Sequence, residues 1–137
     1  AKDAGVAREI LALAPGSVDL TGRTSLDEAI DLMSLATRVV TNDSGLMHVA
    51  AAFGVPQAAV FGSTSPIHTP PLNARARVLW LKEELQLDCM PCFDRTCRFG
   101  HYGCLEGVSE EELARIPITY VDGQHDGFAP PEHVSHL

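Results

Sequence analysis

The chain has 137 residues, a length that suits one domain with a buried core. A formal net charge of -8, with only 10 scattered Lys and Arg residues, argues against nucleic acid or an anionic membrane surface as a partner. The sequence has no apolar run approaching the ~20 residues that cross a bilayer, and no signal-peptide pattern, so we expect a cytoplasmic protein without a transmembrane segment. It opens directly on a helical pattern without an initiator Met, which suggests a fragment of a larger protein.

The hydrophobic pattern predicts helices and strands that alternate along the chain. In chain order we expect a helix over 1–13, a strand over 18–20, a turn over 21–24, a helix over 26–36, a strand over 38–41, a helix over 46–53, strands over 58–61 and 77–81, and a short helix from 109. Ser25 and Glu28 form the capping-box pattern at the start of the second helix. The strand over 58–61 is apolar throughout, as in parallel sheets that are covered on both faces. The predicted fold class is therefore α/β, with a Rossmann-like parallel sheet.

Three polar turns follow the predicted strands, at Thr21–Thr24, Asn42–Gly45 and Gly62–Thr69. In parallel α/β sheets, ligands bind beyond the carboxyl ends of the strands. We therefore expect the three turns to lie around one cleft.

An apolar strand runs directly into the polar stretch Thr41–His48, which opens a helix. The first turn of a helix has unsatisfied N–H groups and the positive end of the helix dipole, so phosphate binds there readily. Gly45 would let the backbone approach a ligand closely, and His48 lies on the same side as Ser44. Repulsion keeps the Asp43 carboxylate away from a phosphate, but the hydroxyl groups of an attached sugar would donate to it. The predicted ligand is a phosphorylated sugar or a sugar nucleotide.

The same residues also suit a plain helix N-cap. Asp or Ser before a helix often satisfies the amides of the first turn with its own side-chain oxygen. The spacing of Asp43 and Ser44 alone leaves both interpretations open.

Four cysteines lie close together in the sequence, within a segment that we expect to be irregular. They are Cys89, Cys92, Cys97 and Cys104. A tetrathiolate metal site, local disulfides and reduced thiols are the three candidates, and a cytoplasmic setting disfavours disulfides. A structural zinc ion is therefore one hypothesis, with His101 as a substitute ligand. An iron-sulfur cluster is less favoured, because nothing else in the sequence suggests redox chemistry.

The sequence predicts two parts of the chain. Residues 1–120 are expected to form a ligand-binding domain with a cysteine-rich insertion over 88–106, and residues 121–137 a poorly ordered tail. Three histidines lie in that tail without periodicity, and exposed tail histidines are usually not metal ligands. They are His125, His133 and His136.

Three of the polar loops, in order, resemble a known family. Residues 20–26, 41–52 and 61–66 with 69–71 are similar to the C-terminal half of the ADP-heptose:lipopolysaccharide heptosyltransferases of glycosyltransferase family 9. The resemblance covers about residues 1–115. The tail departs from it, and the cysteine segment resembles only some members.

The resemblance implies an inverting, metal-independent glycosyltransferase of the two-domain GT-B type, in which this chain would be the donor-binding half. It implies that Asp43 binds heptose hydroxyls, that Ser44 and Gly45 bind the diphosphate, and that His48 lies beside the phosphates. Other donor-binding residues implied by the match are Thr24, Thr64, Lys2 and Asp3, of which the last two would reach the adenosine.

The resemblance also implies partners. ADP-heptose would be the donor, and a lipid-linked core oligosaccharide would be the acceptor, held by an N-terminal domain that also supplies the general base. The lipid-linked acceptor implies peripheral association with the inner membrane. No catalytic residue is then expected in this chain, and the chain alone should be inactive.

Three other interpretations stay open at this point. A related GT-B transferase would use another sugar nucleotide, since an anion site does not select the sugar or base. A sugar-nucleotide epimerase shares the layout but needs acid-base residues, for which Asp43 and His48 are the main candidates. A non-enzymatic module could instead be organised by a metal on the four cysteines.

Overall fold

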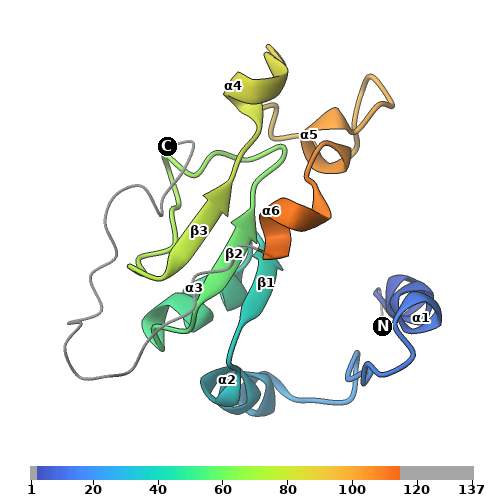
Figure 1. Ribbon diagram of the computed structural model, residues 1–137, viewed down its shortest axis with the longest axis vertical. Helices are drawn as coiled ribbons and strands as arrows, with labels where there is room; N and C mark the ends of the chain where they lie inside the picture. The colour runs from blue at the N-terminus through green and yellow to red at the C-terminus, as the bar shows by residue number, and fades with distance from the viewer. Residues whose placement is uncertain (1–2, 115–137) are drawn as a thin grey trace. The chain divides into compact units, whose positions relative to one another are not determined.

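The computed structural model describes residues 3–114, and its ribbon is shown in Figure 1. The chain divides into two compact units, with the boundary between Leu32 and Met33. Lys2 and the predicted tail over 121–137, with its three histidines, lie outside the described residues.

The first unit begins with helix α1 (Ala4–Leu13), which confirms the predicted helix. The strand predicted over Val18–Leu20 is wrong. Both the backbone amide and the hydroxyl of Thr21 donate to the Asp19 carboxylate, the amide at 2.8 Å, and they form a local turn in place of a strand. These hydrogen bonds from Thr21, above all the hydroxyl's, also lower the pKa of Asp19. A β-strand needs a partner to satisfy its backbone, and a side-chain-capped turn satisfies it locally.

Helix α2 (Leu26–Leu35) starts with the predicted capping box. The Ser25 amide donates to the Glu28 carboxylate at 3.0 Å, and the Glu28 amide donates to the Ser25 hydroxyl at 3.2 Å. These reciprocal bonds satisfy two of the donors that a helix start leaves free.

Replacing Ser25 with Ala should lower the free energy of unfolding by about 1 kcal/mol, because the Glu28 amide loses its acceptor. Glu28→Gln keeps an acceptor for the Ser25 amide and should have a smaller effect. Denaturant titration followed by circular dichroism measures both. Equal stability of wild type and Ser25→Ala would show that the box contributes nothing to folding.

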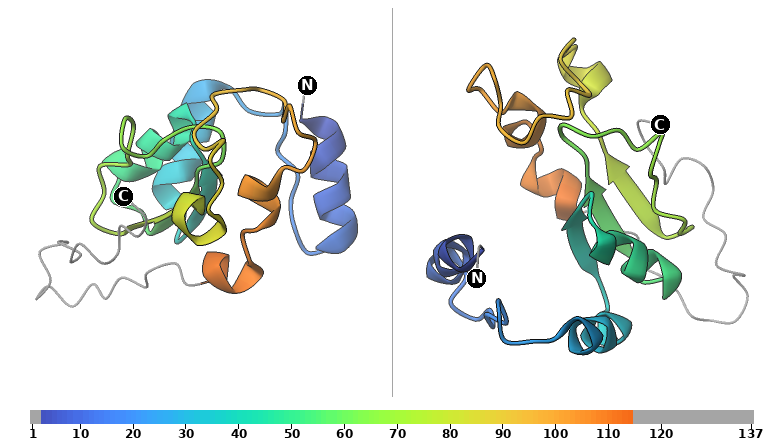
Figure 2. Two further views of the ribbon diagram at one scale, coloured as in Figure 1. Left: turned by 90° about the horizontal axis from the view of Figure 1, so that it is seen from above. Right: turned by 180° about the vertical axis from the view of Figure 1, so that it is seen from behind.

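The second unit is built on a parallel sheet of three strands in the order β1-β2-β3. They are β1 (Val39–Asn42), β2 (Gln57–Val60) and β3 (Ala76–Leu79), all within two residues of the predicted bounds. Asn42 pairs with Val60, and Val60 with Leu79, so the three carboxyl ends are level. The predicted parallel α/β fold is confirmed, and Figure 2 shows the sheet from two further sides.

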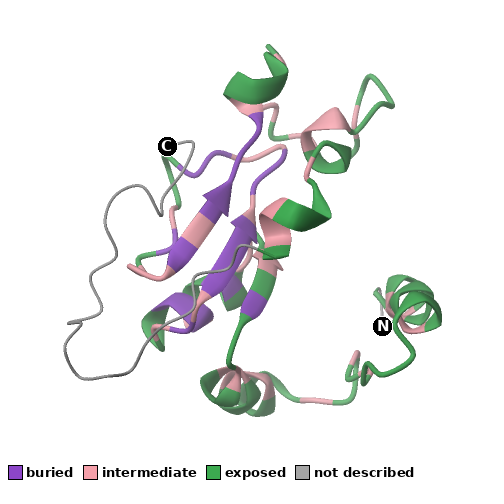
Figure 3. Cartoon of the chain, viewed as in Figure 1, coloured by how far each residue is buried: buried purple, intermediate pink, exposed green. Residues whose placement is uncertain are grey.

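Helix α3 (Gly45–Ala52) connects β1 to β2 and packs on the sheet through its buried residues Met47, Ala50 and Ala51. Two apolar clusters fill the space between these elements, as the buried positions in Figure 3 show. The larger one contains Met47, Ala59, Phe61, Val78, Trp80 and Met90, and the smaller one contains Val39, Ala50 and Val55. Strand β2 is buried on both faces, as its continuous apolar run predicts.

Three short helices follow the sheet: α4 (Lys82–Leu85), α5 (Gly103–Glu106) and α6 (Glu110–Ala114). The prediction of an irregular cysteine segment was therefore wrong for the single turn of α5, which contains Cys104. Single turns carry too little periodicity to be recognised in a sequence. The predicted cap of the last helix is confirmed, since the Glu112 amide donates to the Ser109 hydroxyl at 3.2 Å. Glu112 also forms an ion pair with Arg77 of β3.

Candidate functional site

Two of the three predicted polar turns come together at the carboxyl edge of the sheet. Strands β1 and β2 are neighbours with level ends, so the turn after Asn42 lies beside the loop after Val60. We call residues Gly62–Thr69 the β2 loop. The Thr69 hydroxyl oxygen is 3.5 Å from each oxygen of the Asp43 carboxylate, which places the far end of this loop against the turn. The third turn, Thr21–Thr24, belongs to the other compact unit.

The N-terminus of α3 has no side-chain cap. Ser44 occupies the N-cap position with an extended backbone, but its hydroxyl makes no hydrogen bond to the first-turn amides. It lies 3.4 Å from the Thr41 hydroxyl oxygen. The residues therefore do not follow the plain N-cap interpretation. The Met47 amide donates to the Ser44 carbonyl at 3.1 Å, whereas the Gly45 and Leu46 amides remain available to an anion.

Gly45 has no steric reason to be glycine. It is exposed, and a Cβ atom built on it would meet no atom within 4 Å. Glycine at a helical position costs up to about 1 kcal/mol relative to alanine, so a fold with this much space gains nothing from it. The fold therefore does not require glycine here, and a glycine at this position would allow a ligand to approach the backbone closely.

The other predicted ligand-binding residues are spread over both units. His48 is exposed on α3, one turn beyond the half-buried Ser44, and Thr64 is half-buried in the β2 loop. Thr24 and Asp3 lie in the first unit, where Asp3 takes the N-cap position of α1 without a side-chain cap bond. The structure thus brings Asp43, Ser44, Gly45 and His48 together on a single strand-turn-helix corner.

Sequence reasoning placed Thr69 in the loop but did not identify it as a neighbour of Asp43. The β2 loop is held in shape by buried residues, because Ser65 is only 3% exposed and its hydroxyl accepts a hydrogen bond from the Ile67 amide at 3.2 Å. The abundance of hydroxyl residues and prolines in the loop was the available signal.

The four cysteines form a second group at the same edge of the sheet. Figure 1 shows α4, which precedes the cysteine segment, and α5, which contains Cys104, beyond the arrowheads of the strands. All four thiols and His101 line one cavity of about 80 Å³, together with Gly62 and Ser63 of the β2 loop. All four cysteines are free thiols. Within residues 3–114, no three His, Cys, Asp or Glu side chains already stand where they could hold a metal ion.

The thiols have different environments. Backbone amides around Cys97, that of Tyr102 most strongly, hydrogen-bond to its sulfur and lower its pKa. Burial raises the pKa of Cys104, and the neighbouring sulfurs of Cys89, Cys92 and Cys97 add to that rise. Thiolate charge is therefore favoured at Cys97 and disfavoured at Cys104.

The region that the structure describes contains no helix both long and apolar enough to cross a membrane.

Comparison with known proteins gives consistent matches. The family model of glycosyltransferase family 9 (heptosyltransferase) matches residues 1–103. Lipooligosaccharide heptosyltransferase 2 of Haemophilus influenzae is 49% identical over 88 residues, which are 61% of this chain and 25% of that protein. Lipopolysaccharide heptosyltransferase 2 of Escherichia coli is 52% identical over 63 residues, which are 46% of this chain and 18% of that protein.

A solved structure is also similar. The structure of E. coli ADP-heptose lps heptosyltransferase II matches with a TM-score of 0.52 and 44% identity, covering 59% of this chain and 26% of that one. The chain thus spans about a quarter of the length of the relatives that it matches. The strand-turn-helix corner with its uncapped amides lies within the matched region, and the chain belongs to glycosyltransferase family 9, the heptosyltransferases.

Proposed function

We propose that this chain is the donor-binding part of an enzyme that transfers L-glycero-D-manno-heptose from ADP-heptose to the inner core of lipopolysaccharide. Membership of the heptosyltransferase family supports this function, as do relatives named heptosyltransferase 2. The observation that carries it is the α3 N-terminus, where uncapped amides and an exposed glycine stand beside the Asp43 carboxylate. This pairing suits a diphosphate attached to a polyhydroxylated sugar.

Each residue at the corner has a role in this proposal. The amides at Ser44 and Gly45 bind the diphosphate, and the Ser44 hydroxyl adds a further donor, with His48 beside the phosphates. Asp43 accepts hydrogen bonds from heptose hydroxyls, and Thr64 contributes from the β2 loop. Lys2, Asp3 and Thr24, from the start of the chain, are proposed as donor-binding residues on the family resemblance alone.

The mechanism follows from charge development. As the bond between the anomeric carbon and the diphosphate breaks, negative charge grows on the departing ADP. The α3 N-terminus and the surrounding hydroxyl donors stabilise that charge, so transfer needs no metal ion. The general base that deprotonates the acceptor lies outside this chain in the proposal, and attack from the opposite face of the sugar inverts the anomeric centre. The lipid-linked acceptor would bring the complete enzyme to the cytoplasmic side of the inner membrane.

Calorimetric and NMR titration of the chain with ADP-heptose tests the proposal, with ADP and UDP-glucose as comparison ligands. Saturable binding of the two adenine ligands with shifts at Asp43, Ser44, Gly45 and His48 is expected. A preference for UDP-glucose would point to a GT-B transferase with another donor. If none of the ligands shifts the NMR signals of these four residues, they do not belong to the donor site.

Gly45→Ala separates ligand binding from folding. The added methyl group meets no protein atom, so the free energy of unfolding should stay unchanged or rise by up to about 1 kcal/mol. If the diphosphate contacts this backbone, the added methyl group blocks that contact. Affinity for ADP should then fall about tenfold or more, equivalent to about 1.4 kcal/mol. Gly16→Ala is the matched control, because a Cβ at Gly16 also meets no atom within 4 Å but Gly16 lies outside the proposed donor site. Equal ADP affinity of the two variants would contradict the proposed contact.

A further inference from the structure

We propose that the four cysteines bind one zinc ion as a tetrathiolate site, and that this ion holds the cysteine segment (residues 88–106) against the β2 loop. The inference goes beyond the proposed glycosyl transfer, which needs no metal. Two features support it: all four cysteines line one cavity, and the cysteine segment contacts the β2 loop.

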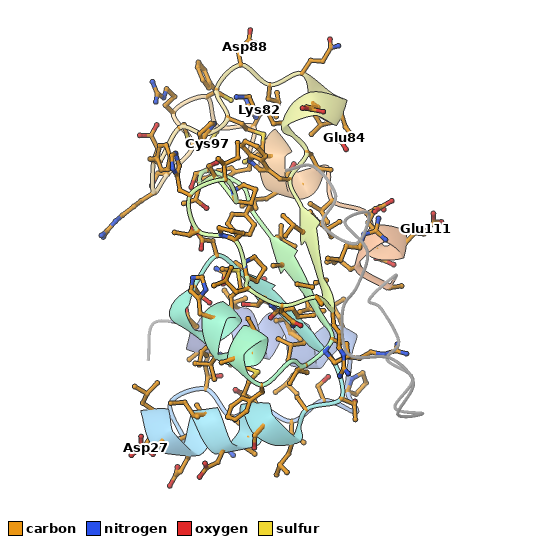
Figure 4. All side chains as sticks on the ribbon, turned by 90° about the vertical axis from the view of Figure 1, so that its left-hand side faces the viewer. Asp27, Lys82, Glu84, Asp88, Cys97 and Glu111 are labelled. Carbon is orange, nitrogen blue, oxygen red and sulfur yellow. The ribbon has the colours of Figure 1, made fainter. Side chains whose placement is uncertain are left out.

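The first observation is that all four cysteines line one cavity. Cys89 and Cys92 come from the stretch after α4, Cys97 from the following loop and Cys104 from α5, yet they line the same cavity of about 80 Å³. Figure 4 labels Cys97 among the side chains of this segment. One water needs roughly 10–15 Å³ of such space, so the cavity has room for an ion. Within residues 3–114 no three of these side chains already stand where they could hold a metal ion, so the thiols must turn inward to reach the zinc–sulfur distance of about 2.3 Å.

The second observation concerns the histidine that lines the same cavity. The Nδ1 atom of His101 already accepts a hydrogen bond from the Gly103 amide at 2.9 Å, and its ring stacks on Phe99. The proposed ligand set is therefore the four thiols.

The chemistry of the donor set selects the ion. Four sulfur ligands in a tetrahedral arrangement favour zinc or an iron-sulfur cluster over magnesium or calcium, which prefer oxygen. The cavity is lined mainly by a segment that has little regular structure, and a bound zinc ion contributes folding energy to such segments.

The cysteine segment contacts the β2 loop, and the β2 loop in turn contacts Asp43. The Phe93 amide, between Cys92 and Cys97, donates to the Ser63 carbonyl of the β2 loop at 2.7 Å. The Phe93 ring also lies 6.4 Å from the His68 ring. A Cβ atom on Gly62 would come within 2.7 Å of Leu105, next to Cys104, so the segment packs directly on the loop backbone. Fixing the segment therefore fixes the loop that reaches Asp43.

The test measures metal content in the full chain purified under reducing conditions without chelator. Mass spectrometry of dissolved metals should find one zinc per chain, and replacement by Co²⁺ should give the sulfur-to-cobalt charge-transfer absorption of a tetrathiolate. Cys97→Ser and Cys104→Ser should each weaken zinc binding at least tenfold. Arg95→Ala is the control, since this exposed residue lines the same cavity without a thiol. Reduced protein without zinc, iron in place of zinc, or unchanged zinc in both serine variants would overturn the proposal.

A second measurement does not depend on whether the serine variants fold. The wild-type chain is treated with a chelator, then supplied with zinc again, and digested briefly with a protease at each stage. Cleavage within residues 88–106 should rise at least tenfold on chelation and return to its starting rate with zinc. The same cleavage rate at all three stages would overturn the structural role. Neither readout uses a nucleotide, so failure of the donor-binding proposal would leave the outcome unaffected.

Discussion

On the proposed function, Asp43→Ala is expected to lower heptose transfer about 10- to 100-fold, measured in a complete heptosyltransferase that includes this chain. That range corresponds to the loss of one hydrogen bond to a charged group, worth about 1.5–3 kcal/mol. The effect on stability should be small, within about 0.5 kcal/mol, because the carboxylate is half-buried and its contact to Thr69 is long at 3.5 Å. Transfer kinetics with ADP-heptose and denaturant titration measure the two quantities separately.

Two further variants sharpen this test. Asp43→Asn keeps the size of the side chain and one carbonyl acceptor but removes the charge, so it should recover part of the lost rate. Glu83→Ala removes an exposed carboxylate on α4 and serves as the control for net charge. Wild-type kinetics in Asp43→Ala would take this residue out of the donor site. A rate loss matched by an equal loss of folded protein would instead assign it a structural role.

Phe61→Ala is expected to have the largest effect on stability, lowering the free energy of unfolding by about 3–5 kcal/mol. The ring is 0% exposed and packs in the larger apolar cluster with Met47, Trp80 and Met90. Removing it leaves a cavity at the point where β2 passes into the β2 loop. Because native domains have only about 5–15 kcal/mol of net stability, the variant should be close to unfolding.

Phe53→Ala is the matched control for this prediction. Phe53 follows α3 directly and is 48% exposed, so its truncation should cost about 1 kcal/mol or less. Guanidinium titrations of both variants give the comparison. Similar midpoints for the two would mean that the cluster around Phe61 is not the main core of the unit.

Much of the fold could be predicted because its signals are local. The capping box at Ser25 and Glu28 marks a helix start within four residues, and the apolar run of β2 marks a strand buried on both faces. The strand-turn-helix corner at Asp43–Gly45 was predicted for the same reason. The error at Val18–Leu20 has a local cause too, since the bonds from Thr21 to Asp19 favour a turn over an extended strand.

The sequence by itself determined the parallel α/β order and the polar corner at the start of α3, because periodicity and turn chemistry are properties of neighbouring residues. Only the tertiary structure showed that Ser44 leaves the helix amides uncapped and that Thr69 lies beside Asp43. Only the tertiary structure gathered the four thiols into one cavity against the β2 loop. The contact of Thr69 with Asp43 and that of the cysteine segment with the β2 loop join segments far apart in the chain. They depend on how whole elements pack, which no local pattern records.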